Sequence, residues 1–187
     1  APNESPQSYS TVGSSVSILS EDTITESNNL FLGETLNNNL PGMNYFRSGG
    51  HGTIAGIQLR GLPKRYSTVY IDGVKMSDPS SSDNSFYFSN IMNSSIKKVE
   101  VLRGSQSSMY GSGAIGGAIN IYTKDGEDKN LNKFIISGGS NNAKNLDVSY
   151  GEAYNNHSYY LGLNLFNTDG ISAMNDEVST NDDDSYE

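Results

Sequence analysis

The chain has 187 residues, no cysteine, no tryptophan and a formal net charge of −9 at pH 7. This acidic balance argues against a nucleic-acid-binding protein, which would need a basic surface. The lack of cysteine excludes a disulfide scaffold and thiolate metal sites. No run of about 18 apolar residues exists, so no transmembrane helix is expected, although short alternating strands can also cross membranes.

The first region, up to about residue 124, mixes short strands with short helices. Alternating apolar and polar residues predict strands around 16–18, 57–59, 69–71, 99–101 and 118–123. Ser20 can cap a brief helix that ends near Glu26. Leucines spaced four residues apart predict a second helix over 30–40, which Pro41 and Gly42 would end. A further short helix, capped by Ser89, is expected over 89–95, and Asp72-Gly73 predicts a turn.

The stretch YGSGAIGGAINIYTKDG (110–126) contains a literal G-x-G-x-x-G pattern. A dinucleotide-binding loop must open a helix, whose N-terminus holds the pyrophosphate. Here a β-branched and aromatic strand pattern follows, and the nearest acidic residues lie in a polar turn. The pattern therefore predicts glycines that serve backbone geometry, either in tight bends or where another segment approaches closely.

After the polar stretch KDGEDKNLN, the pattern changes to three successive strands without helices. They are expected over 134–139, 145–154 and 158–168, with turns at 140–142 and 155–156. Each strand has one apolar face and one mostly polar face. Such a face meets a core in a soluble protein and lipid in an outer-membrane barrel. Periodicity alone favours the soluble sheet.

Four stretches of the first region occur in a fixed order, and together they carry a resemblance. They are LGETLNNNLPGM (32–43), IQLRGL (57–62), VYIDGV (69–74) and IKKVEVLRGSQSSMYGSGAIGGAINIYTK (96–124). Over about 120 residues the chain resembles the plug domain of TonB-dependent outer-membrane transporters.

The resemblance implies an α+β plug domain over 1–124, a small mixed β-sheet with short helices. A linker over 125–132 and the first antiparallel strands of a transmembrane β-barrel over 133–187 would follow. A barrel of this family has about 22 strands. The chain is therefore expected to be a fragment, the plug with an incomplete barrel.

The resemblance also implies a function in the bacterial outer membrane. The family binds a scarce ligand, a corrinoid such as vitamin B12 or a ferric siderophore, and imports it with energy from the inner membrane. The stretch 57–76 and the later GGSNN and TDGIS favour the cobalamin branch. The expected partners are this ligand, outer-membrane lipid and TonB, which grasps an N-terminal box missing here; no nucleic acid is expected. No catalytic motif supports an enzyme, and the alternative is a stand-alone plug-like ligand-binding module without a pore.

Within this family, arginines and acids of the plug are held against the inner barrel wall by charge-assisted bonds. The resemblance places Arg60, Glu100 and Arg103 in such plug–barrel contacts, with ordinary solvated or paired charges as the alternative. The loops 63–67 and 77–85 correspond in order to outward-facing plug loops. The candidate ligand-binding residues there are Lys64, Arg65, Tyr66, Asp78, Asp83 and Asn84. A simple solvated loop is the alternative for these residues.

Clustered carboxylates in the last residues could bind Ca²⁺. The cobalamin branch orders an extracellular loop with calcium at about this place, and Asp182 and Asp184 are the best matches. Ser172 stands where that branch carries another acid, and a solvated acidic loop is the alternative. No other cofactor is expected. His51 and His157 lie far apart in sequence, so we expect loop or turn residues rather than metal ligands.

Overall fold

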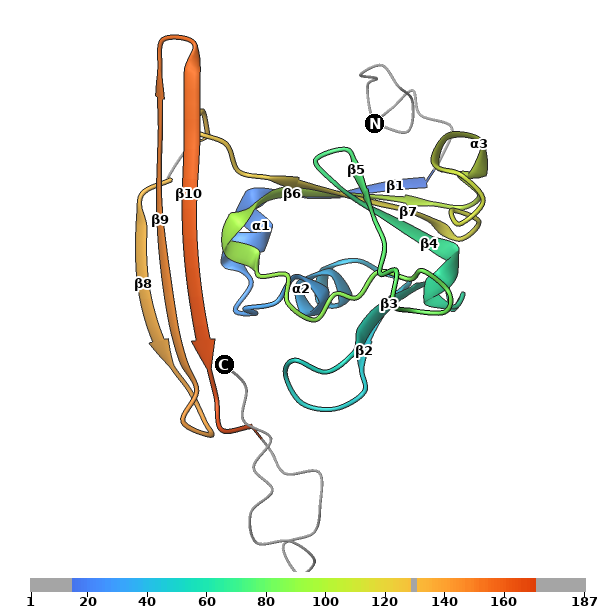
Figure 1. The fold of residues 1–187 in the computed structure, drawn as a ribbon, viewed down its shortest axis with the longest axis horizontal. Helices are drawn as coiled ribbons and strands as arrows, with labels where there is room; N and C mark the ends of the chain where they lie inside the picture. The colour runs from blue at the N-terminus through green and yellow to red at the C-terminus, as the bar shows by residue number, and fades with distance from the viewer. Residues whose placement is uncertain (1–14, 129–130, 171–187) are drawn as a thin grey trace, which may run out of the picture. The chain divides into compact units, whose positions relative to one another are not determined.

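The computed structural model describes residues 15–128 and 131–170, which divide into two compact units. Among these residues the first unit comprises 15–46 and 54–123. The second comprises 47–53, 124–128 and 131–170. Figure 1 labels the elements of both units, and each unit is described by itself.

The first unit is built on a mixed five-stranded sheet of order β1-β6-β7-β4-β5 (Figure 1). Its strands are β1 (Ser15–Leu19), β4 (Ser67–Ile71), β5 (Val74–Met76), β6 (Ile96–Arg103) and β7 (Gly117–Thr123). β4 runs parallel to β7, and the other neighbouring strands are antiparallel. A parallel pair needs a long crossover connection, and here the chain between β4 and β7 supplies β5 and β6.

A two-stranded ribbon, β2 (Met43–Arg47) with β3 (Ala55–Leu59), accompanies this sheet. The helical elements are α1 (Glu21–Glu26), α2 (Leu32–Asn39), α3 (Ser107–Tyr110) and the 3₁₀ turns η2 (Lys64–Tyr66) and η3 (Asn93–Ser95). No helix in the described part of the chain is long and apolar enough to cross a membrane. The predicted N-cap of α1 is confirmed, because the Ser20 hydroxyl accepts a hydrogen bond from the backbone N–H of Thr23.

The helix expected over 89–95 is wrong, because only the single turn η3 forms there. Met92 precedes it in an extended conformation and makes a β-bridge with Phe31. The Asn93 amide donates to the backbone oxygen of Asn29 and to the hydroxyl of Thr35, both at 2.7 Å. These contacts attach residues 92–93 to the start of α2, and they keep the backbone just before η3 in an extended conformation.

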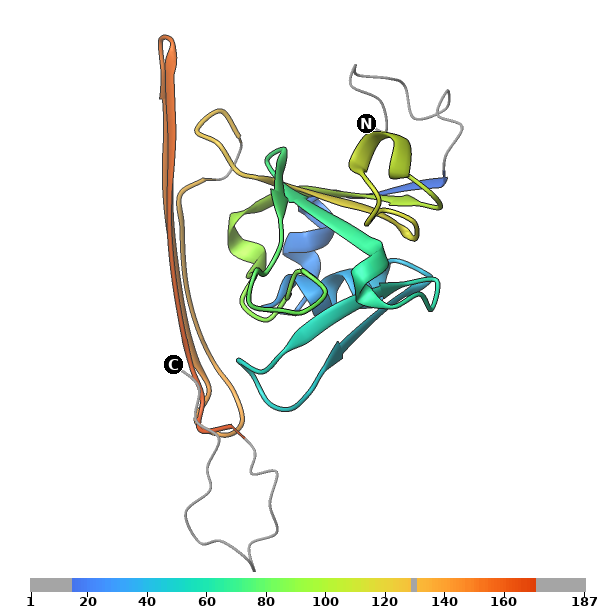
Figure 2. The ribbon, with the colours of Figure 1, turned by 45° about the vertical axis from the view of Figure 1, so that its right-hand side comes forward.

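The core of the first unit lies between one face of the sheet and the helices α1 and α2, as Figure 2 shows. Leu32 and Leu36 of α2 are fully buried, and Phe88 is buried among the same residues. The sheet contributes the apolar side chains of alternate positions: Val69, Val99, Val101, Ile119 and Ile121. The apolar residues that alternate in the sequence therefore point to the same face of the sheet, and this face is buried.

The glycine-rich stretch confirms the prediction of backbone geometry rather than a nucleotide site. Gly111 ends α3 with φ 83°, a conformation that favours glycine. Gly117 has φ 149°, and a Cβ there would overlap the carbonyl oxygen of Leu102 on β6. At Gly116 a Cβ would lie 3.1 Å from the carbonyl oxygen of Tyr66. The glycines therefore let β7 begin in close contact with its neighbours.

The second unit contains an antiparallel sheet of order β10-β9-β8, formed by β8 (Lys133–Gly138), β9 (Lys144–Tyr154) and β10 (His157–Asn167). These strands agree with the predicted ones to within one residue at each end. Asn141, Asn142 and Asn155 have φ of 52–54° in the connecting turns, where asparagine tolerates the left-handed conformation.

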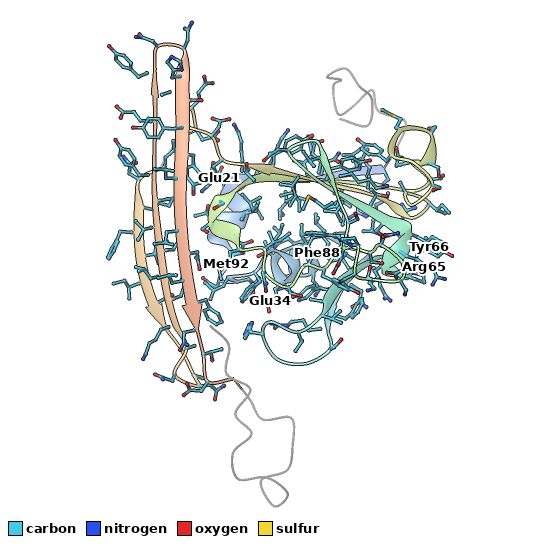
Figure 3. All side chains as sticks on the ribbon, viewed as in Figure 1. Glu21, Glu34, Arg65, Tyr66, Phe88 and Met92 are labelled. Carbon is cyan, nitrogen blue, oxygen red and sulfur yellow. The ribbon has the colours of Figure 1, made fainter. Side chains whose placement is uncertain are left out.

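The apolar side chains of this sheet lie on an exposed face. Phe134, Ile136 and Leu161 are 66–71% exposed, whereas Asp147 and Ser149 on β9 are buried. Figure 3 shows that side chains project from both sides of the three strands. Among residues 15–128 and 131–170 no core packs against this apolar face, which contradicts the soluble-sheet interpretation.

Candidate functional site

The cationic residues predicted to bind ligand lie on η2, next to an aromatic residue from a later loop. Lys64 Nζ sits 4.0 Å from the ring centroid of Tyr87. The Arg65 guanidinium lies 4.9 Å from the ring centroid of Tyr66 and donates to its hydroxyl at 3.3 Å. Figure 3 shows Arg65 and Tyr66 beside each other, on the outside of the first unit. Both cations thus already contact an aromatic ring.

The acidic residues of the 77–85 loop are ordered by bonds to neighbouring serines. Asp78 accepts from both the N–H and the hydroxyl of Ser80, and these two bonds lower the pKa of Asp78. The contact with Ser85, whose backbone N–H donates to Asp83 at 3.2 Å, likewise lowers the pKa of Asp83, against a smaller effect of burial. The positive charge of Lys64 acts on both carboxylates in the same direction. Asn84 turns the chain with φ 50°.

The two predicted loops therefore come together as one group of mixed charge, which we call the loop cluster. It comprises Lys64, Arg65, Tyr66, Asp78, Asp83 and Tyr87. Tyr87 was not predicted from the sequence; it follows the loop in a run of three consecutive aromatic residues, FYF (86–88). The positive charges of Lys64 and Arg65 and the negative charges of Asp78 and Asp83 cancel, so the loop cluster has no net charge.

The second unit contains a further polar contact that the sequence analysis did not identify. A guanidinium nitrogen of Arg47, the last residue of β2, lies 2.7 Å from Nδ1 of His51 in the loop that follows. The His51 ring meets Phe166 of β10 edge-on, with 5.2 Å between the ring centroids. His51 is a loop residue, as predicted. In the sequence, the only indication of this contact is that an arginine and a histidine flank the glycine pair Gly49-Gly50.

The three residues predicted to contact a barrel wall have different environments. Arg103 is buried and donates to the Ser17 hydroxyl and, at 2.9 Å, to the Pro41 carbonyl. Glu100 is buried and accepts from Lys98 at 2.9 Å and from the Tyr122 hydroxyl at 3.3 Å. Arg60 is exposed, with φ 52°. Their role against a barrel wall stays a prediction.

The predicted calcium ligands Asp182 and Asp184 lie outside the described residues, so that site also stays a prediction. Within residues 15–128 and 131–170, no group of three or more histidine, aspartate or glutamate side chains is placed to hold a metal ion.

Along the chain, a mixed five-stranded sheet with short helices is followed by three antiparallel strands whose apolar side chains are exposed. Residues 8–118 match the family model of the TonB-dependent receptor plug domain. The chain therefore belongs to the TonB-dependent receptor plug-domain family, as the sequence predicted. Members of this family are β-barrel proteins of the outer membrane, and the predicted location is confirmed at that level.

Individual relatives agree with this membership. The vitamin B12 transporter BtuB of Photobacterium profundum is 32% identical over 145 residues, which cover 77% of this chain and 23% of the relative. The structure of the siderophore receptor PiuA from Acinetobacter baumannii has a TM-score of 0.64 at 23% identity, covering 83% of this chain and 21% of that one. The FrpB iron transporter from Neisseria meningitidis (F3-3 variant) has a TM-score of 0.66 at 21% identity, covering 84% and 24%.

The two structural likenesses show the fold, and they confirm the predicted α+β plug followed by antiparallel barrel strands. The chain spans less than a quarter of the length of the curated relative that it matches.

Proposed function

We propose that the chain is the plug and the first wall strands of a receptor that imports a scarce ligand across the outer membrane. The observation that carries this proposal is the exposed apolar face of β8–β10, which follows a plug-type unit along the chain. Burying apolar area contributes about 25 cal/mol per Å². A face with residues such as Ile136 and Leu161 therefore needs a lipid environment or another cover.

The family supports two partners for such a receptor. TonB would bind an N-terminal box and transmit energy from the inner membrane, and lipid would surround the strands. A stand-alone ligand-binding module is less well supported, because its exposed strands would carry an apolar face and unpaired edges. Nothing in the proposal requires catalysis.

For the ligand, we favour a corrinoid over a ferric siderophore. The 32% identical relative is named as a vitamin B12 transporter. The loop cluster adds a physical argument, because Lys64 and Arg65 are balanced by Asp78 and Asp83. A cluster without net charge gives no long-range attraction to a strongly anionic chelate. It suits a large ligand that is recognised by hydrogen bonds and aromatic contact.

The test uses cells that lack their own receptors and carry the complete gene. Uptake of radiolabelled cyanocobalamin and of iron-55 siderophores of several chemical classes is measured side by side. We expect saturable cyanocobalamin uptake. Uptake of a ferric siderophore and not of cyanocobalamin would overturn the corrinoid assignment but would still support an import receptor. A complete protein that is soluble and binds either ligand would instead support the stand-alone module.

A further inference from the structure

The exposed face of the three-stranded sheet changes its chemistry along β9 and β10. The leucines at alternate positions of β10 are all more than half exposed: Leu161, Leu163 and Leu165. Toward the turn between β9 and β10, the same face carries Tyr150, Glu152 and Tyr159, which we call the Tyr-Glu-Tyr patch. Glu152 is in register with Tyr159, and Tyr150 with Leu161. A polar group with a carboxylate therefore adjoins the row of leucines directly.

The carboxylate of the patch is held between the two tyrosines. The Tyr150 hydroxyl donates to Oε2 of Glu152 at 3.0 Å, and the Tyr159 hydroxyl donates to the same oxygen at 3.2 Å. The two tyrosine rings lie 6.0 Å apart, centroid to centroid. An ionised carboxylate has acceptor sites on both of its oxygens. The patch thus combines a fixed negative charge, further acceptor capacity and two aromatic rings.

The described charges around the patch are mainly negative. Lys144 and Glu152 are the charged residues at outward positions of the three described strands, and they lie eight residues apart on β9, about 27 Å of extended chain. The segment 124–128 lies against the patch, since a Cβ on Gly126 would be 2.4 Å from the carbonyl oxygen of Glu152. With this segment and the first residue of β8, the nearby charges are Glu152, Asp125, Glu127 and Asp128 against Lys124 and Lys133. Lys133 is in register with Ser149, on the opposite face of the sheet.

A carboxylate beside aromatic rings suits an ammonium group, because the carboxylate accepts its N–H hydrogens and the rings attract its charge. The leucines that continue from the patch suit an acyl chain. We propose that the patch binds the primary ammonium headgroup of a zwitterionic phospholipid, whose acyl chains lie along β10. Tyr154 and His157, in register at the next outward positions, can donate to the lipid phosphate. This inference rests on the proposed function, since it takes β8–β10 as wall strands in a membrane.

The test is site-specific photocrosslinking of the complete receptor in lipid nanodiscs. The nanodiscs contain equal amounts of phosphatidylethanolamine and phosphatidylcholine with identical acyl chains, so the two lipids differ only in methylation of the headgroup nitrogen. Leu161→p-benzoylphenylalanine places the photoreactive group beside the patch, and Leu165→p-benzoylphenylalanine places it farther along the same face. We expect phosphatidylethanolamine to be captured about three-fold more often than phosphatidylcholine beside the patch, as for a charge-assisted contact at an exposed site. Mass spectrometry should find the two lipids in equal amounts at the Leu165 position.

Two further variants show whether the carboxylate is responsible. Glu152→Gln keeps the shape and removes the charge, and it should return the ratio at the Leu161 position to equality. Glu127→Gln removes the same charge from the neighbouring segment and should leave the enrichment nearly unchanged.

The outcomes separate this inference from the proposed function. Equal capture of the two lipids beside the patch, or an enrichment that survives Glu152→Gln, would overturn the inference and leave the receptor assignment intact. Absence of lipid from both positions would overturn the lipid-facing role of β8–β10 as well. A crosslink to a second receptor instead of lipid would assign this face to a protein contact and overturn the lipid site.

Discussion

At the scale of single residues, Gly117 is the most constrained position of the glycine-rich stretch. A Cβ at this position would meet the carbonyl oxygen of Leu102, and the φ of 149° is one that other residues rarely adopt. We expect Gly117→Ala to destabilise the first unit by about 3 kcal/mol or more, from strain and overpacking together. Urea unfolding measures this loss.

Gly50, in the segment 47–53 of the second unit, provides a control for the general cost of replacing a glycine by alanine. It has open space around the position of a Cβ, and its φ is not in the left-handed region. Gly50→Ala should change the free energy of unfolding by less than about 0.5 kcal/mol. Equal effects of the two substitutions would contradict the close-approach account.

Tyr122 gives a dependence of stability on high pH. Its pKa is raised to about 12, mainly by burial and by the charge of Glu100, whereas an unfolded tyrosine has a pKa near 10. The folded state therefore binds this proton more tightly, and its contribution to stability is complete below about pH 10. It is lost as the pH rises from about 10 to about 12.

Substitution of Tyr122 by phenylalanine removes the titrating group and keeps the ring. We expect the difference in unfolding free energy between the two proteins to shift in favour of Tyr122→Phe as the pH rises over this window. A difference that stays constant between about pH 9 and about pH 12 would show that Tyr122 does not titrate with the fold.

Arg60 is the clearest test of the predicted plug–barrel contacts. Arg103 has bonds inside the first unit, so its removal would also disturb the fold. Arg60 is exposed, and Arg60→Ala should leave the stability of the first unit within about 0.5 kcal/mol. In the complete receptor we expect the plug to be held less firmly and more large antibiotic to leak into cells. Normal expression with unchanged leak would contradict the contact.

At the scale of elements, the three-stranded sheet is expected to face lipid. Leu163 lies in the middle of β10 and is 53% exposed, whereas Tyr154 ends β9 at a turn. In the complete receptor, Leu163→Lys should destabilise the inserted barrel by about 2–4 kcal/mol, and Tyr154→Lys by about 0–1, because the cost of a charge depends on depth. Heat-modifiable migration on gels follows the folded barrel, and equal effects at both sites would argue against lipid on this face.

The sequence predicted most strands because alternation and turn residues are local signals. It missed β2, whose residues MNYFR do not alternate cleanly, and α3, which has only four residues before Gly111. It also could not assign the buried face of β8–β10. A period of two shows which side chains share a face, and it does not show which face meets solvent.

The candidate site was predictable only in part, for a related reason. The cations of η2 and the acids of the next loop were recognisable by residue type. Tyr87 is 23 positions from Lys64, and Phe166 is 115 positions from His51, so these contacts depend on the fold rather than on sequence spacing. A pocket lined by Tyr70, Tyr110 and Tyr122 is likewise assembled from β4, α3 and β7.

At the scale of the whole molecule, two units of opposite character follow one another along the chain. The first buries an apolar core beneath its sheet, and the second exposes its apolar side chains. This combination fits a receptor whose plug is a water-soluble fold and whose wall is solvated by lipid. The same chain could not keep both surfaces stable in water alone.

The central claim is energy-coupled import, and one measurement tests it most directly. Cells that carry the complete gene are compared with and without functional TonB for uptake of labelled ligand, with surface binding measured in parallel. The account predicts that binding persists without TonB while uptake falls to background. Uptake that is the same in both strains would contradict it.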